Sequence, residues 1–290
     1  MTPRVLLRLG RVSNLPTVWT NVLAGVVLAG PQIELLPLAV LLIALSLFYV
    51  AGMYLNDAFD RDVDARERPE RPIPSGQISG RAVFTAGLAM LAVGEALLAI
   101  VGFVSESGHG WGPVVSGLAL ALAILYYNTH HKANPLSPLV MGFCRMLVYV
   151  TAALSVAPQL TEPVLLGAAV LLAYVAGLTY AARQENLTEF QNLWPLACLA
   201  IPFIYGATGA LASWVGVGIS ITFLAWVIYG VSHFVGRKPL NIPRGVVTLI
   251  AGISLLDALL IANQGEGSLA VLAVAGMVLT RLFQRFVPGT

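Results

Sequence analysis

Long apolar runs follow one another along almost the whole chain, and they constrain its fold more than any other feature. A helix of about 20 residues is long enough to cross the roughly 30 Å hydrocarbon core of a bilayer. Charged residues make up 10% of the 290 residues, whereas an ordinary soluble domain has about 25%. We therefore predict an all-α, polytopic membrane bundle of nine or ten spans, surrounded by membrane lipid and forming one domain over 1–290. The runs expected to span are 13–30, 35–56, 81–104, 112–129, 137–157, 163–182, 193–212, 214–232, 245–262 and 267–284.

The basic residues indicate how this bundle is oriented. With a cytoplasmic N-terminus, alternate loops receive all 16 lysine and arginine residues, and the opposite loops receive none. Cytoplasmic loops of membrane proteins are enriched in these residues. We therefore predict a multi-pass protein of the cell inner membrane with both termini cytoplasmic. A net charge of only +2, without a basic tract interleaved with aromatic residues, argues against a nucleic-acid partner.

An acidic cluster, Asn56-Asp57-Ala58-Phe59-Asp60-Arg61-Asp62-Val63-Asp64, follows the second predicted span. At 100° per residue, Asp57, Asp60 and Asp64 share one face of a helix, whereas Asp62 points away. Carboxylates gathered on one face near a membrane are costly, and a divalent cation would offset that cost. Mg²⁺ prefers oxygen ligands and completes its shell with water and phosphate oxygens. We therefore predict that the three aspartates on the shared face bind Mg²⁺ and are catalytic. The alternative is a solvated helix end whose carboxylates pair with Arg61, Arg66 and Arg68.

A loop that contains prolines and arginines comes next, from Arg66 to Gly76. Proline ends a helix because it lacks an N–H group and restricts the residue before it. Arginine carries a permanent charge and a planar set of donors that suits phosphate oxygens. The acidic face beside Arg71 is therefore equipped to bind a diphosphate together with Mg²⁺, and the cytoplasmic end of the bundle is its expected location.

The pattern Asn56-Asp57-x-x-Asp60-x-x-x-Asp64, followed by Arg71-Pro72-Ile73-Pro74-Ser75-Gly76, resembles the first aspartate motif and the following loop of the UbiA superfamily of intramembrane prenyltransferases. The segments Arg11–Pro16 and Tyr127–Lys132 are also similar to that family. The resemblance implies a helical bundle around a central cavity, with two acidic motifs that hold Mg²⁺ and an isoprenyl diphosphate at the cytoplasmic end. It also implies transfer of the isoprenyl group to an electron-rich acceptor, aromatic or otherwise hydrophobic, within the membrane.

The region of the second acidic motif departs from the family pattern, because Leu178 to Phe190 contains no aspartate. Glu185 and Glu189 are four residues apart and so lie on one helix face. We predict that these two glutamates replace the missing aspartates as ligands of a second metal or diphosphate site. Arg183 is a candidate to replace a metal electrostatically by binding the diphosphate itself. The alternative is a polar helix end with an ordinary ion pair between Arg183 and a glutamate.

Four further residues are candidates for diphosphate binding: Asn14, Asn56, Lys132 and Arg145. Arg145 is expected inside the fifth span, where a charged side chain usually faces a cavity, although its side chain could instead extend to the interface. The adjacent His130 and His131 cannot both face one site, and we interpret them as interfacial residues. Glu95 and Asp257 lie within spans, and the sequence leaves open whether each is a buried contact or lines the cavity.

The sequence also allows an alternative function, which is not enzymatic. The run from Thr179 to Glu185 resembles the divergent UbiA-like branch found in Ebo-type metabolite-export clusters. That resemblance implies a protein that binds a hydrophobic metabolite, or helps to export it with partners from an export pathway, without prenyl transfer. The intact first motif favours the enzyme, and the altered second motif favours the binding or export protein.

Overall fold

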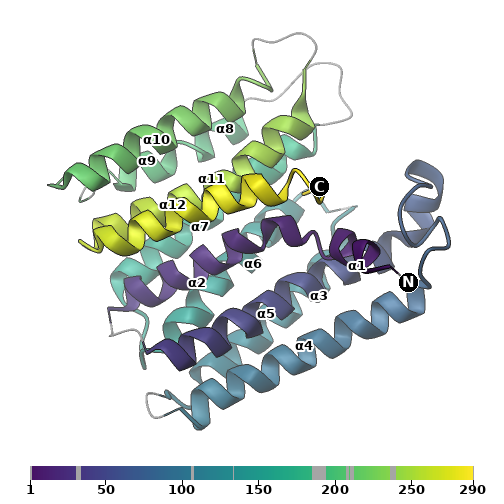
Figure 1. The fold of residues 1–290 in the computed structure, drawn as a ribbon, viewed down its shortest axis with the longest axis horizontal. Coiled ribbons are helices and arrows are strands. Elements are labelled where there is room, and N and C mark those ends of the chain that lie inside the picture. The colour runs from purple at the N-terminus through teal and green to yellow at the C-terminus, as the bar shows by residue number, and fades with distance from the viewer. Residues whose placement is uncertain are drawn as a thin grey trace.

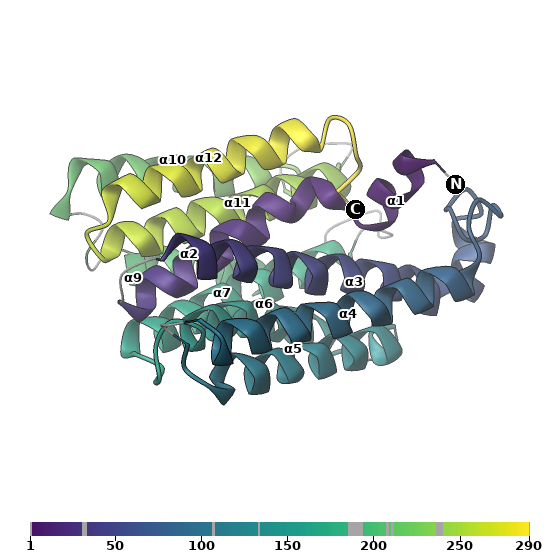
Figure 2. The same ribbon diagram turned by 60° about the horizontal axis from the view of Figure 1, so that its bottom comes forward.

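The computed structural model describes residues 2–30, 34–105, 108–132, 134–184, 194–206, 209, 212–235 and 240–289, and every regular element in these ranges is a helix. The long helices lie side by side, and the labelled N- and C-terminal ends are at the same end of the bundle (Figures 1 and 2). The predicted all-α class is therefore confirmed. The elements are α1 (Pro3–Leu9), η1 (Val12–Asn14), α2 (Leu15–Ala29), α3 (Leu35–Glu67), α4 (Gly80–Phe103), α5 (Trp111–His130), α6 (Ser137–Leu154), α7 (Glu162–Ala182), α8 (Trp194–Cys198), α9 (Ile201–Gly206), α10 (Trp214–Val231), α11 (Ile242–Asn263) and α12 (Gly267–Phe283).

Within the described ranges, eight helical segments are long and apolar enough to cross a membrane. Two shorter apolar regions, Trp194–Gly206 and Gly267–Phe283, coincide with the seventh and tenth predicted spans. Eight of the ten predicted spans therefore correspond to long helical segments in the structure, and the other two correspond to the shorter apolar regions. This number of apolar helices makes the chain an integral membrane protein.

The predicted span over 193–212 differs most from the structure, which divides it into α8 and α9. Pro202 is the second residue of α9. Proline has no N–H group to donate, and its ring would clash with a carbonyl of the preceding turn, so a continuous helix cannot pass through this position unchanged. The amide nitrogens of Leu199 and Ala200 instead donate within tight turns, to the carbonyls of Leu196 and Ala197.

Helix α3 continues beyond the predicted span over 35–56 and ends only at Glu67. The next residue, Arg68, has left the helical conformation, with φ −143° and ψ 61°. It precedes Pro69, and a residue before proline is driven out of the helical region by contact with the proline ring. The extension matters for function because it places the whole acidic cluster on one rigid helix.

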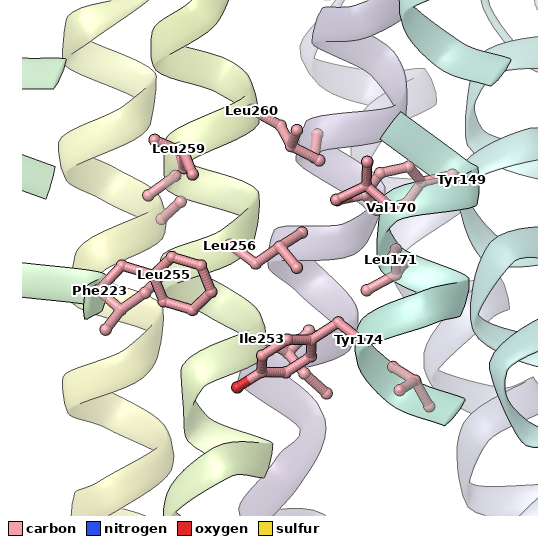
Figure 3. Packing of buried hydrophobic residues seen from close by; sticks show 14 of the residues in the cluster. Tyr149, Val170, Leu171, Tyr174, Phe223, Ile253, Leu255, Leu256, Leu259 and Leu260 are labelled. Atoms are coloured by element: carbon pink, nitrogen blue, oxygen red, sulfur yellow. The ribbon is translucent and has the colours of Figure 1, made fainter. Parts of the chain in front are cut away.

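Helices α2 and α11 form the centre of the bundle, because they are the most completely buried spans. One apolar cluster joins α2 to α3, α4, α5 and α6, and a second joins α2 to α6, α7, α10 and α11. Figure 3 shows side chains of the second cluster, among them Leu256 of α11, Leu171 of α7 and Phe223 of α10. At Gly25 of α2, an added Cβ would lie 2.8 Å from the carbonyl oxygen of Tyr149, so only glycine permits the close approach of α2 and α6.

Candidate functional site

A cavity of about 320 Å³ opens between η1, α2, α3, α5, α6, α7 and α11. Much of its wall is apolar, with side chains such as Phe48, Leu120 and Ile253. Its polar lining includes Arg11, Asn14, Tyr49, Asn56, Arg71, Asn128 and Arg145. The combination suits a ligand with a long apolar part and a charged head.

The acidic face of α3, defined here as Asp57, Asp60 and Asp64, points into the protein. These residues are 8%, 8% and 5% exposed, and the 100° spacing that groups them explains why all three are buried together. The side chain of Asp62 is 84% exposed and pairs with Arg61. The structure thus separates Asp62 from the other three, as the helical spacing predicts.

Arg71 connects two carboxylates of the acidic face. Its Nη1 atom lies 2.7 Å from Oδ2 of Asp64 and 3.5 Å from Oδ1 of Asp57. Arg11, which the sequence analysis did not select as a site residue, also reaches this group, with Nη2 at 3.5 Å from Oδ1 of Asp57 and 3.4 Å from Oδ1 of Asn56. Two aspartates therefore converge on one positive group, and a second arginine stands beside them.

Asp60 has different partners, which come from the end of α5. Nζ of Lys132 lies 3.1 Å from Oδ1 of Asp60, and Nε2 of His131 lies 3.4 Å from Oδ2. Lys132, a predicted diphosphate-binding residue, thus lies at the acidic face. The interpretation of His131 as an interfacial residue missed its contact with Asp60. Its spacing of four residues from Tyr127 was the available signal, because the two rings stack 5.0 Å apart on one side of α5.

The donor set of the acidic face fits Mg²⁺. The carboxylates of Asp57 and Asp64 already converge on one cationic nitrogen, and Mg²⁺ is usually bound through one or two carboxylates with water and phosphate completing its shell. No group of three acidic, histidine or cysteine residues that could hold a metal occurs in the part of the chain that the structure describes. A metal held here would therefore take most of its shell from water and substrate.

The second predicted motif is only partly visible. Glu185 and Glu189 lie outside the described residues. Arg183 is the residue at the end of α7, and its Nη1 donates to the carbonyl of Asn134 at 3.1 Å and to Oγ of Ser137 at 3.3 Å. The structure therefore does not bring Arg183 to the acidic face, and in this conformation it ties α7 to the loop before α6.

Asn14 and Asn56 line the cavity but are engaged with the protein. Nδ2 of Asn14 donates to the carbonyl of Gly289 at 2.8 Å, and its Oδ1 accepts from Nε2 of Gln284 at 3.0 Å. Nδ2 of Asn56 donates to Oδ1 of Asn128 at 3.2 Å. Asn56 thus sits between Arg11 and α5, whereas Asn14 fastens the C-terminal segment to the site.

The structure shows where Asp257 and Glu95 lie, the two acidic residues whose roles the sequence did not decide. Asp257 is completely buried and accepts hydrogen bonds from Asn21 and Tyr149, so it is a buried contact that does not line the cavity. Glu95 of α4 is close to Gly117 of α5, away from the cavity. Its carboxylate oxygens have no hydrogen-bond partner among the described residues.

The chain is similar in sequence to a known family and to several known proteins. A model described as "UbiA prenyltransferase family" matches residues 17–190. The chain is 28% identical to the digeranylgeranylglyceryl phosphate synthase of Methanopyrus kandleri over 265 residues, which cover 86% of this chain and 88% of that protein. It is 40% identical to the chloroplastic chlorophyll synthase of Oryza sativa subsp. japonica over 82 residues, covering 28% of this chain and 20% of that protein.

Solved structures share the fold. A UbiA homologue from Archaeoglobus fulgidus, bound to GPP and Mg²⁺, superposes with a TM-score of 0.63 at 17% identity, covering 93% of this chain and 99% of that one. A UbiA homologue from Aeropyrum pernix K1 superposes with a TM-score of 0.55 at 19% identity, covering 94% of this chain and 96% of that one. At this identity the likeness concerns the fold alone.

Proposed function

Because the chain belongs to the UbiA prenyltransferase family, we propose that it transfers an isoprenyl group from a prenyl diphosphate to an electron-rich acceptor within the membrane. The observation that carries this proposal is the connection between the acidic face and the cavity: Arg11 and Arg71, which pair with the buried Asp57 and Asp64, line a largely apolar cavity. A charged head bound there would place its hydrocarbon chain along the apolar wall. The acceptor is aromatic or otherwise hydrophobic.

The reaction breaks the bond between the allylic C1 carbon and the diphosphate oxygen, and the electron pair leaves with the diphosphate. The acceptor forms a bond to C1 and releases a proton. Mg²⁺ supplies positive charge to the departing diphosphate when it is bound. Asp57, Asp60 and Asp64 would hold the metal, directly or through its water ligands. Arg71 and Lys132 would donate to phosphate oxygens, and the apolar wall would keep water from the electron-deficient carbon.

The relatives support the cofactor and the substrate class. The homologue from Archaeoglobus fulgidus was bound to GPP and Mg²⁺, and the relative from Methanopyrus kandleri is a digeranylgeranylglyceryl phosphate synthase. We infer that this chain also uses Mg²⁺ and a prenyl diphosphate, because its own acidic face offers suitable carboxylates. Glu185 and Glu189 are proposed as ligands of a second metal or diphosphate site. Asn14, Asn56 and Arg183 are proposed as further residues that bind the diphosphate.

We propose that the protein lies in the cell inner membrane, with both termini and the acidic face on the cytoplasmic side. Its support is the one-sided distribution of the 16 basic residues. Both labelled ends of the chain also lie at one end of the bundle (Figure 2). A single domain over 1–290 is part of the same proposal.

A second candidate function is binding or export of a hydrophobic metabolite without prenyl transfer. The observation that favours it is the pairing of every carboxylate of the acidic face with a protein cation: Asp57 and Asp64 with Arg71, and Asp60 with Lys132. Such a face is already compensated in charge and could persist without a metal. Partners in an export pathway belong to this second candidate only.

The two candidates separate in one assay. Purified protein in lipid nanodiscs is given a panel of prenyl diphosphates, and both binding and diphosphate release are measured with Mg²⁺ and with EDTA. We expect Mg²⁺-dependent binding and release, and we expect Asp60→Asn to reduce both by at least about tenfold, because a charge-assisted contact contributes about 1.5–3 kcal/mol. Asp62→Asn, on the exposed side of the same helix, is the matched control. Tight binding in EDTA that survives Asp60→Asn, without release, would favour the second candidate.

A further inference from the structure

Three arginines gather where α11 begins and α12 ends. Arg244 lies in the first turn of α11, Arg281 lies in the last turn of α12, and Arg285 follows that helix. α10 and α12 both pack along α11 (Figure 1). Arg244 and Arg285 are close enough to Arg281 to act on its charge. None of the three lines the central cavity, so this arginine cluster, defined here as Arg244, Arg281 and Arg285, is separate from the proposed active site.

The arginine cluster has no acidic partner among the ion pairs of the described residues. After Glu189, the sequence contains only two acidic residues, Asp257 and Glu266. Asp257 is completely buried and lies 13 residues beyond Arg244 in α11, about 20 Å along the helix axis. Glu266 precedes α12 at the end opposite to Arg281. The arginines therefore repel one another, and neither of these two carboxylates is placed to offset the repulsion.

Two aromatic side chains of α10 stand beside the arginine cluster. The central carbon of the Arg281 guanidinium lies 5.8 Å from the centre of the Trp226 ring, within the range of a cation–π contact. Nε1 of Trp226 donates to the carbonyl of Thr248 at 2.8 Å, which fixes the indole against α11. Nη2 of Arg244 donates to the hydroxyl of Tyr229 at 3.4 Å. Both arginines are thus held by neutral groups, which orient them without removing their charge.

The cluster keeps hydrogen-bond donors for a further partner. A guanidinium has five N–H groups. Within the described ranges, Arg281 donates to Oε1 of Gln284 at 3.0 Å, and the recorded side-chain acceptor of Arg244 is the hydroxyl of Tyr229. That hydroxyl accepts from Arg244 and retains its own proton to donate. The Tyr229 ring is held in place by the buried His233, whose ring lies edge-on at 4.8 Å between centres.

This cluster lies at the level where a membrane span ends. Tyr229 is two residues from the end of α10 at Val231, and Arg281 is two residues from the end of α12. Tryptophan and tyrosine are enriched at the same level, where membrane and water meet. Leu224 and Ile228 are exposed on α10 and lead from the cluster toward the middle of the span. A cationic group therefore adjoins an exposed apolar surface.

A phosphate group attached to a hydrocarbon part suits this arrangement. Arginine donates to phosphate oxygens through a planar set of N–H groups, and basic sites between membrane helices on the cytoplasmic side bind acidic lipid headgroups. The first turn of α11 also favours an anion, because the helix dipole makes a cation such as Arg244 unfavourable there. We propose that the arginine cluster and Tyr229 bind the phosphate of an anionic phospholipid, with its acyl chains along the apolar surface of α10.

The apolar surroundings favour a lipid over a soluble phosphate compound. Leu282 and Phe286, the neighbours of Arg281 and Arg285 in the sequence, are exposed as well. Acyl chains would cover these side chains, whereas a small soluble anion would leave them uncovered. The proposal does not depend on prenyl transfer, because the cluster lies outside the cavity.

The test measures lipid binding to the purified full chain in a non-ionic detergent with EDTA. Native mass spectrometry compares dioleoyl phosphatidylglycerol, which is anionic, with dioleoyl phosphatidylcholine, whose headgroup is neutral overall. We expect the wild type to bind the anionic lipid at least about tenfold more tightly, as one charged hydrogen-bonded contact allows. Arg281→Gln should abolish this preference, and Arg281→Lys should keep part of it, because lysine keeps the charge but loses the planar donors. Arg81→Gln, which removes a charge from the exposed start of α4, should behave as the wild type.

Unfolding temperatures distinguish lipid binding from a structural role of the arginines. Without lipid, Arg281→Gln and Arg285→Gln should each unfold at the wild-type temperature or above it, because each removes one of three mutually repelling charges. Phosphatidylglycerol should raise the unfolding temperature of the wild type more than that of either variant. Equal binding of the two lipids by the wild type overturns the proposal, as does a preference kept in both variants. Glycerol 3-phosphate that binds as tightly as phosphatidylglycerol would overturn it too, since the site would then bind a soluble anion without using the acyl chains.

Discussion

Replacement of Arg71 by glutamine tests whether the acidic face is built to gather positive charge. One nitrogen of Arg71 lies 2.7 Å from Asp64 and 3.5 Å from Asp57, and the three side chains are at most 16% exposed. Removing one partner of a buried ion pair leaves an uncompensated charge and costs about 3–5 kcal/mol. Asp57 keeps Arg11 at 3.5 Å. We therefore expect Arg71→Gln to lower the free energy of unfolding by about 3 kcal/mol, the lower end of this range, in the absence of divalent cations.

Mg²⁺ should restore much of this loss, because two carboxylates freed from Arg71 offer a cation the ligands that it prefers. A ligand that binds only the folded state stabilises it by about 2.7 kcal/mol when its concentration is 100 times its dissociation constant. The wild type should gain less from Mg²⁺, since Arg71 already occupies the position between the carboxylates. The double variant Arg71→Gln with Asp64→Asn should lose less stability in EDTA than Arg71→Gln alone.

Thermal unfolding of the full chain in detergent, followed by tryptophan fluorescence in EDTA and in Mg²⁺, measures these differences. Arg66→Gln is the matched control, because Arg66 is an exposed residue in the last turn of the same helix. If both arginine variants lose the same stability and gain equally from Mg²⁺, then Arg71 does not compensate the acidic face and the reasoning is refuted.

Three further predictions address the second motif, the packing and the orientation. Glu185→Gln and Glu189→Gln should each weaken Mg²⁺-dependent binding of a prenyl diphosphate by roughly 10- to 150-fold, whereas a larger loss in Arg183→Gln, with both glutamate variants unaffected, would contradict a metal site there. Gly25→Ala should lower stability by about 1–3 kcal/mol because its Cβ would meet the backbone of α6 at 2.8 Å; Gly218→Ala, with open space around it, is the control, and equal unfolding temperatures for the two would contradict the packing argument. A cysteine added at either terminus should react with a membrane-impermeant reagent only after the cells are opened, and labelling of intact cells would reverse the proposed orientation.

The sequence alone determined the class of fold and the first half of the site. Apolar length and the scarcity of charge are local properties that only a membrane bundle satisfies, and the helices confirm it. The grouping of Asp57, Asp60 and Asp64 also follows from local geometry, since a helix repeats every 3.6 residues. The division of 193–212 was accessible in the same way through Pro202, because a proline acts on its own helix.

Only the tertiary structure decided which side chains meet across helices. Arg11 reaches Asp57 over 46 residues of sequence, and Asn21 reaches Asp257 over 236. Helical periodicity places a residue on a face, but it does not say which other face packs against it. The contacts of Arg145 with Thr17 and Asn21 of α2 show the same limit, because they are consequences of how α2 and α6 pack, and packing is a property of the whole bundle.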